Sequence, residues 1–208
     1  MSIYAAVRAL AGGDELVERL VERERRNSAV YGYGTNAFLL SLVETLLEQA
    51  VAPSVICDVV EQVRVTIYAA GSNPVLLDEV PEVLDQLQGH RLLLVTRGDL
   101  AEQRRKVDSS GLAGRFDQVE ILPDKEPRTY SRMLAKHGIE PSNFAMVGNS
   151  LVADILPAIE IGASAVLVPR PLGWAVEASS TTFEHPRFRT ISKIAELPGA
   201  LSELQRQA

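Results

Sequence analysis

The second half of the sequence alternates short apolar runs, rich in Val, Ile and Leu, with longer amphipathic segments. The apolar runs cover residues 91–96, 118–122, 143–147 and 163–168, with a weaker run at 188–191. The segments between them have helical spacing, and they cover residues 76–88, 99–110, 127–137, 150–161 and 192–205. Apolar strands that alternate with crossover helices are typical of a parallel sheet covered on both faces. The sequence therefore predicts an α/β fold with a parallel-sheet core.

The first 70 residues contain helical patterns and no convincing strand. A glycine-rich break at residues 31–35 separates an early helical region from apolar residues at helical spacing after Phe38, and a further helix is expected over residues 54–66. Turn residues cluster at 71–74, which places a boundary there. We therefore expect an all-helical N-terminal domain over residues 1–74 and the sheet-containing core over residues 75–208.

Charge and composition exclude several classes of protein. The net charge of −6 argues against a nucleic-acid binder and against attachment to anionic lipid. No apolar run reaches 18 residues, and no signal peptide is visible, so the sequence predicts no membrane association. The single Cys57 excludes an internal disulfide; it is expected to be a buried small hydrophobe, and a cytoplasmic location is expected. The three histidines lack metal-ligand spacing and are expected at the surface or at helix ends.

Polar residues follow the first predicted strand of the core, at the edge of the sheet where ligands of such folds bind. Asp99 is a good N-cap, and Glu102 three residues later completes a capping-box pattern. The hydroxyl of Thr96 is thereby expected beside a helix N-terminus, which favours an anion. The alternative is that this segment is simply a capped turn between a strand and a helix.

The next two strand ends also carry groups suited to a phosphate and its counter-ion. Lys125 lies between a strand end and a helix that begins near Pro127, although a lysine there can also be a solvated surface residue. Gly148 permits an unusual backbone angle or a close approach, and Asn149 and Asp154 offer oxygen ligands for a hard cation such as Mg²⁺. Asn149 can equally be a turn residue, and Asp154 can serve only to offset the helix dipole.

These segments resemble the haloacid dehalogenase-like hydrolase superfamily, whose members are mostly magnesium-dependent phosphatases. Residues 93–99 are similar to its second motif, with Thr96 in the hydroxyl position; Lys125 lies in a segment similar to the third motif; and residues 146–158 are similar to the fourth. Residues 25–34 resemble the helical cap of one bacterial branch. The resemblance implies a Rossmann-like core with a helical cap, which hydrolyses a small phosphate monoester.

The resemblance also implies roles for individual residues. Thr96 would hydrogen-bond the transferring phosphoryl oxygen, Lys125 would offset its charge, and Asn149 and Asp154 would hold Mg²⁺. The family more often has Asp at the position of Asn149, so the affinity for metal is expected to be lower. The expected substrate-binding residues are Arg97 and Gly98 in the core and Arg26, Asn27, Tyr31 and Tyr33 in the cap. The partner would be a small phosphorylated metabolite, bound by a monomer or homodimer.

The family's first motif has no counterpart in this sequence. That motif is an Asp-x-Asp-Gly pattern whose first Asp is the covalent nucleophile, and no two aspartates here lie two positions apart. The resemblance implies that the strand preceding this motif is central in the sheet, so we expect a gap or an improvised filler there and weak or absent Mg²⁺ binding. Two explanations stay open. In the first, which we favour, a segment of about 10–25 residues is missing upstream. In the second, the chain is a degenerate phosphate-binding or scaffold protein without chemistry.

Overall fold

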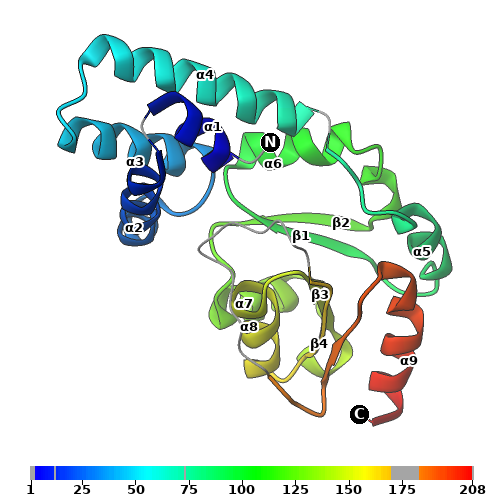
Figure 1. Ribbon diagram of the computed structural model, residues 1–208. Helices are drawn as coiled ribbons and strands as arrows, with labels where there is room; N and C mark the ends of the chain where they lie inside the picture. Colours follow the sequence, from blue (N-terminus) through cyan, green and yellow to red (C-terminus); the bar gives the residue numbers. More distant parts are fainter. Residues whose placement is uncertain (1–2, 12, 73, 170–182, 208) are drawn as a thin grey trace. The chain divides into compact units, whose positions relative to one another are not determined.

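The structure is a computed structural model that describes residues 3–11, 13–72, 74–169 and 183–207 (Figure 1). Contacts within the chain divide it into two compact units. The first, here named the helical unit, comprises Met1–Val75 and Thr96–Ala113; the second, the sheet unit, comprises Leu76–Val95 and Gly114–Ala208. These units are defined by contacts alone, so the functional division into a cap over 1–74 and a core over 75–208 stays a prediction.

The helical unit is built from α1 (Ile3–Ala11), α2 (Gly13–Tyr31), α3 (Thr35–Glu48), α4 (Pro53–Ser72) and α6 (Leu100–Ser109). Its core is a cluster of apolar side chains that recur at helical spacing, including Leu16 and Leu20 of α2 and Phe38, Leu42 and Leu46 of α3. Helix α4 is longer than the predicted 54–66, and the segment after position 66 includes Ala69 and Ala70, the residue type with the best helix propensity.

A carboxyl group lies between the first two helices of this unit. The hydroxyl of Tyr4 on α1 donates a hydrogen bond of 2.7 Å to Glu24 on α2. Burial raises the pKa of Glu24 to about 7, and the bond from Tyr4 offsets only part of that shift. The folded chain therefore holds a proton on Glu24 over a pH range in which the unfolded chain has lost it.

Stability should consequently fall as the pH rises from about 4.5 to about 7, since the folded state binds more protons than the unfolded state in that window. After a discount for partial exposure, we expect a loss of about 2 kcal/mol. Glu24→Gln should abolish this loss of stability with rising pH. Glu18→Gln, at an exposed position of the same helix, should show the same loss as the wild type. Urea unfolding at pH 5 and pH 8 measures the difference, and equal pH dependence in the wild type and Glu24→Gln would contradict the assignment.

The strands appear where the apolar runs predict them. β1 (Leu93–Arg97) and β2 (Gln118–Leu122) form a two-stranded sheet, and β3 (Ala145–Gly148), β4 (Ser164–Leu167) and β5 (Phe188–Thr190) form a three-stranded sheet in that order. β3 and β5 both pair with β4 in parallel, with Val147 opposite Val166 and Val166 opposite Arg189. Parallel strands joined through helices confirm the predicted α/β class.

The remaining helices and short helical turns belong mostly to the sheet unit: α5 (Val80–Gln86), η1 (Ala113–Arg115), α7 (Pro127–Lys136), η2 (Pro141–Asn143), η3 (Leu151–Ile155), α8 (Leu156–Glu160), η5 (Ile194–Glu196) and α9 (Leu197–Gln207). The helix predicted over 150–161 is a π-helical turn, η3, followed by α8. Pro157 causes this irregularity, because it has no N–H to donate to the carbonyl of Ala153. The buried hydroxyl of Tyr130 donates to that carbonyl instead, at 3.4 Å.

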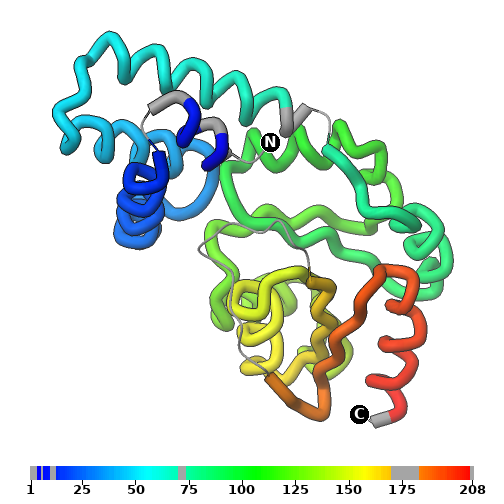
Figure 2. Tube along the Cα trace, in the orientation of Figure 1, coloured from blue at the N-terminus to red at the C-terminus, as the bar shows by residue number. Residues whose placement is uncertain are grey.

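Helices cover both faces of the three-stranded sheet (Figures 1 and 2). On one face, α7 and α8 pack side chains such as Tyr130 and Ala158 against Met146 and Ala165. On the other face, α5 and α9 pack side chains such as Val83 and Leu204 in the same cluster as Val166. Neighbouring residues of β4 thus point into opposite layers, as the pleat of a strand requires.

The two-stranded sheet contributes to the same two layers. Val95 of β1 and Leu122 of β2 pack in the cluster that contains Met146, whereas Leu92, just before β1, packs in the cluster that contains Val166. Among the described residues, β1 and β3 belong to separate sheets. Each of these two strands is therefore an edge strand, although both lie between the same helical layers.

One expectation drawn from a single residue is wrong. Cys57 is exposed rather than buried, because the buried stripe of α4 runs through Ile56, Val59 and Val63 and turns Cys57 away from it. His137 does end a helix, as expected, but its ring is nearly buried and bonds to Glu120 at 2.6 Å. Among the described helices, none has the length and apolar character needed to cross a membrane.

Candidate functional site

A buried ion pair of the sheet unit joins two of the predicted site residues. The Nζ of Lys125 lies 2.5 Å from Oδ1 of Asp154, and their side chains are only 13% and 4% exposed. The backbone N–H of Ser150 donates to the other carboxylate oxygen, Oδ2, at 2.9 Å. Removing such charges from water is costly, so they persist in the interior only when they are paired in this way.

Local sequence places both members of the pair. Ser150 caps the turn that carries Asp154, accepting a hydrogen bond from the N–H of Ala153 at 3.1 Å. On the other side, Asp124 accepts bonds from the N–H of Glu126 and the hydroxyl of Thr129, at 3.0 and 2.5 Å. These bonds fix the loop between β2 and α7 that presents Lys125.

Gly148, the last residue of β3, allows Asp154 to come close to the strand. A Cβ atom at this position would overlap the Cβ and Cγ atoms of Asp154. Of the two roles that the sequence suggests for Gly148, the close approach is therefore the one observed, because its φ is not among the positive values. Any larger residue here would displace the carboxylate that pairs with Lys125.

The predicted metal ligands differ in their surroundings. Asp154 is buried and bonded through both oxygens, whereas Asn149 is exposed. Within the described ranges, no group of three or more His, Cys, Asp or Glu side chains is arranged to hold a metal ion. The assignment of Mg²⁺ to Asn149 and Asp154 stays a prediction.

The turn after β1 belongs by its contacts to the helical unit. The hydroxyl of Thr96 donates to the side-chain carbonyl of Gln103 at 2.9 Å. Asp99 caps α6 by accepting from the N–H of Glu102 at 3.0 Å, as predicted. Gly98 has a φ of 139°, which favours glycine. Because Thr96 and the Lys125–Asp154 pair lie in different units, their convergence on one ligand stays a prediction.

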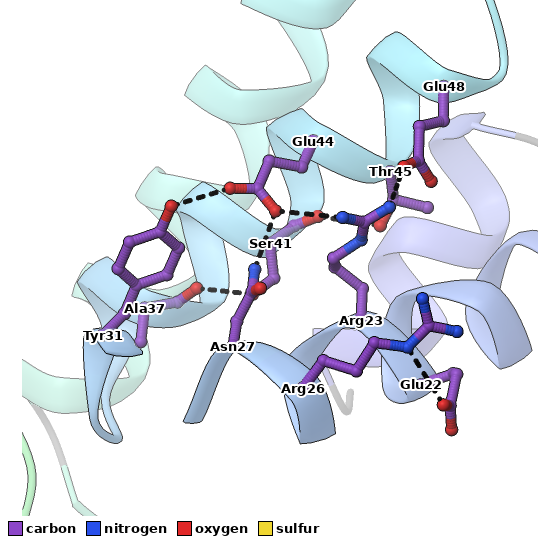
Figure 3. Close-up of polar contacts among 10 residues, drawn as sticks. All are labelled: Glu22, Arg23, Arg26, Asn27, Tyr31, Ala37, Ser41, Glu44, Thr45 and Glu48. Carbon is purple, nitrogen blue, oxygen red and sulfur yellow. Dashed lines mark hydrogen bonds and ion pairs between the residues drawn. The ribbon is translucent and has the colours of Figure 1, made fainter. Parts of the chain in front are cut away.

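Three of the residues predicted to form a substrate-selecting cap, Arg26, Asn27 and Tyr31, are engaged in contacts within the helical unit (Figure 3). Asn27 donates to Glu44 and Ser41 at 2.8 and 3.0 Å, and Tyr31 donates to Glu44 at 2.8 Å. Arg26 pairs with Glu22 at 3.2 Å. Hydrogen bonds from Asn27 and Tyr31 lower the pKa of Glu44 despite the opposing effect of burial. Glu44 thus organises this cluster, and sequence reasoning missed it because its partners lie 13 and 17 positions away.

Next to this cluster, α2 and α3 border an open cavity of about 300 Å³, which is lined by Glu18, Arg19, Glu22, Arg23, Arg26 and Glu48. Three arginines and three glutamates line it, so their charges balance. Elsewhere in the unit, the guanidinium of Arg97 lies 3.6 Å from the centre of the Tyr33 ring, a cation–π contact that joins two of the predicted substrate-binding residues.

The fold is of the α/β class, with parallel strands between two helical layers and a buried ion pair in the segments that follow two of the strands. A family model described as haloacid dehalogenase-like hydrolase matches residues 2–162. The chain belongs to this haloacid dehalogenase-like hydrolase family, which confirms the resemblance seen in the sequence.

Individual relatives and structures agree with this family. The chain is 28% identical to mouse N-acylneuraminate-9-phosphatase over 136 residues, which are 62% of this chain and 53% of that protein. The human protein of the same name is 27% identical over 135 residues, with the same coverage. The chain spans about half the length of the curated relatives it matches.

Solved structures show the same fold over nearly the whole chain. A haloacid dehalogenase-like family hydrolase from Xanthomonas campestris has a TM-score of 0.81 and 28% identity, and the match covers 99% of this chain and 82% of that one. L-2-haloacid dehalogenase from Xanthobacter autotrophicus has a TM-score of 0.65 at 16% identity, covering 97% and 93% of the two chains. The second similarity concerns the fold alone.

Proposed function

We propose that this chain is the phosphate-binding and cation-binding part of a phosphatase that hydrolyses a small phosphate monoester. The observation that carries the proposal is the buried Lys125–Asp154 pair, with its 2.5 Å contact, in the segments that follow β2 and β3. A phosphate and its metal ion need a cation and a carboxylate side by side in a site shielded from water. The phosphatase names of the mouse and human relatives favour this reaction over dehalogenation.

Each predicted residue has a definite role in this proposal. Lys125 offsets the charge on the phosphoryl oxygens, and the hydroxyl of Thr96 donates to one of them. Arg97 and Gly98 bind the substrate beside Thr96. In the helical unit, Arg26, Asn27, Tyr31 and Tyr33 select the organic part of the substrate. We place the protein in the cytoplasm, as a monomer or homodimer that binds a phosphorylated metabolite and neither nucleic acid nor membrane.

The chemistry requires a nucleophile that this sequence does not contain. An aspartate oxygen attacks phosphorus, the bond from phosphorus to the ester oxygen breaks, and the leaving alcohol takes a proton from a second carboxyl group. Water then hydrolyses the aspartyl-phosphate. None of the nine aspartates has another two positions away, so we propose that this chain alone binds phosphate without turning it over.

The donor set fits Mg²⁺ only in part. Asp154 offers a carboxylate and Asn149 an amide oxygen, and Mg²⁺ commonly takes one or two carboxylates together with waters and substrate phosphate. When bound, the ion would offset negative charge on the phosphoryl group. Lys125 already neutralises Asp154, and Asn149 adds no charge. We therefore propose weak Mg²⁺ binding that strengthens when phosphate is present.

A second candidate function is a non-catalytic phosphate-binding or scaffold protein. Two observations favour it: both oxygens of Asp154 are already bonded within the protein, and the Asp-x-Asp pattern is missing from the sequence. It shares the phosphate site with the first proposal and differs only in whether a nucleophile completes that site.

Calorimetric titration of the chain with inorganic phosphate, with and without Mg²⁺, tests the site. Lys125→Met should weaken phosphate binding by about tenfold or more, since a hydrogen bond between charged groups stabilises by about 1.5–3 kcal/mol. Lys136→Met removes an exposed lysine of the same unit and should leave the affinity unchanged. Equal phosphate affinity in the wild type and Lys125→Met, with both proteins folded, would contradict the proposal.

A further inference from the structure

Two helix N-termini meet in the helical unit and share two carboxylates. Glu102, in the first turn of α6, accepts hydrogen bonds from the backbone N–H of Thr35, at 3.2 Å, and from its hydroxyl. Asp99, the N-cap of α6, accepts from the side chain of Asn36 at 3.0 Å. Thr35 and Asn36 are the first two residues of α3. One acidic pair therefore satisfies donors at the start of both helices, where negative charge is favourable.

The loop before α3 follows the surface of this turn closely. Gly34 has a φ of 130°, and a Cβ atom there would lie 2.9 Å from the backbone nitrogen of Asp99. The ring of Tyr33, one residue earlier, lies against the guanidinium of Arg97. Each of residues 33–36 thus lies against a residue of the segment 97–102. Glycine is required at position 34 both for the backbone angle and for the close approach.

Glu102 is held as the charged acceptor of this contact. It is almost buried, and burial opposes ionisation, but hydrogen bonds from Lys106 and Thr35 outweigh that effect and lower its pKa. The side-chain oxygen of its neighbour Gln103 accepts a hydrogen bond from the hydroxyl of Thr96, and the Gln103 side chain lies 3.1 Å from where a Cβ on Gly98 would be. The first turn of α6 therefore connects the loop at 33–36 to the Thr96 hydroxyl.

We propose that Glu102 is a positioning residue, which acts through Thr35 to hold the Thr96–Gly98 turn in the conformation that binds a phosphoryl group. This inference rests on the proposed role of Thr96. Glu102 itself contacts no substrate in this arrangement. Its charge fixes α6 to the loop at 33–36, and Gln103 on the same helical turn then orients Thr96.

Hydrogen exchange and phosphate titration of the full chain test this role separately. In Glu102→Gln, exchange at the amides of residues 96–99 should rise by about tenfold, and the affinity for inorganic phosphate should fall by about tenfold, because a bond to a charged acceptor is lost. Thr35→Val keeps the backbone bond to Glu102, so the exchange rate should rise and the phosphate affinity should fall by only about threefold each. Thr35→Ser keeps the hydroxyl and should restore both to wild-type values.

Lys106→Met is the matched control, since it removes a partner of Glu102 on α6 without changing the loop at 33–36. It should change the exchange rate at residues 96–99 and the phosphate affinity less than Glu102→Gln does. The inference is overturned if exchange at residues 96–99 is the same in the wild type, Glu102→Gln and Thr35→Val. If the wild type binds no phosphate, the proposed function fails, and the exchange measurement still decides the role of Glu102. The serine and valine variants at position 35 keep the test valid if Glu102→Gln does not fold.

Discussion

Replacing Asp154 with asparagine is expected to lower the free energy of unfolding by about 3 kcal/mol. The substitution keeps the shape of the side chain but leaves the ammonium of Lys125, which is only 13% exposed, without its counter-charge. An unpaired charge in such a position loses hydration that nothing replaces. The amide also offers only one acceptor, so the bond from the N–H of Ser150 or the contact with Lys125 must be given up.

A double-mutant cycle separates the pair from its surroundings. Lys125→Met alone should also destabilise, since it leaves Asp154 with the Ser150 N–H as its remaining partner, whereas Lys125→Met combined with Asp154→Asn should recover part of the loss. The control is Arg128→Met, which breaks an exposed pair with Glu126 in the same unit and should cost less than about 1 kcal/mol. Urea unfolding measures all four variants. If Asp154→Asn lowers the free energy of unfolding no more than Arg128→Met does, the buried pair stabilises the fold no more than an exposed pair.

The strands and most helices of the sheet unit could be predicted because they depend on local patterns. Each apolar run is short, bounded by turn residues and followed by a helical repeat, and β1 to β5 appear at those positions. Irregularities were harder to predict. The π-helical turn before α8 depends on Pro157 together with a hydroxyl from Tyr130, which lies 23 residues from the carbonyl it contacts.

The candidate site was predictable to the extent that strand ends of a parallel sheet meet at one edge. Lys125 and Asp154 do meet, as that rule predicts, although they are 29 residues apart and follow β2 and β3, which lie in separate sheets among the described residues. The residues that hold the Thr96 turn have no comparable signal. Glu102 looks like half of a capping box in the sequence, but its carboxylate bonds to Thr35, 67 residues away. Such a contact depends on how helices pack, which local spacing does not encode.

Adding an apolar strand that ends in Asp-x-Asp-Gly to the N-terminus is expected to give the second large effect, Mg²⁺-dependent turnover of p-nitrophenyl phosphate. β1 and β3 are not hydrogen-bonded to each other, yet Val95 of β1 and Met146 of β3 lie in the same apolar layer. An inserted strand would pair with both edges and bring a carboxylate to the end of the sheet that carries Lys125. Loss of a covalent nucleophile typically lowers kcat by a factor on the order of 10³–10⁶, so its addition should raise turnover well above background.

The same addition should stabilise the fold, and this separates the strand from the chemistry. A few new backbone hydrogen bonds of about 1 kcal/mol each predict a gain of about 3 kcal/mol in the free energy of unfolding. An otherwise identical strand with Asn in place of its first Asp should keep the stability gain and show no turnover. If the chain extended with the Asp-x-Asp-Gly strand is stabilised but shows no turnover, the non-catalytic phosphate-binding function is favoured. If neither strand stabilises the chain, β1 and β3 do not accept a strand between them, and the proposed position of the nucleophile is wrong.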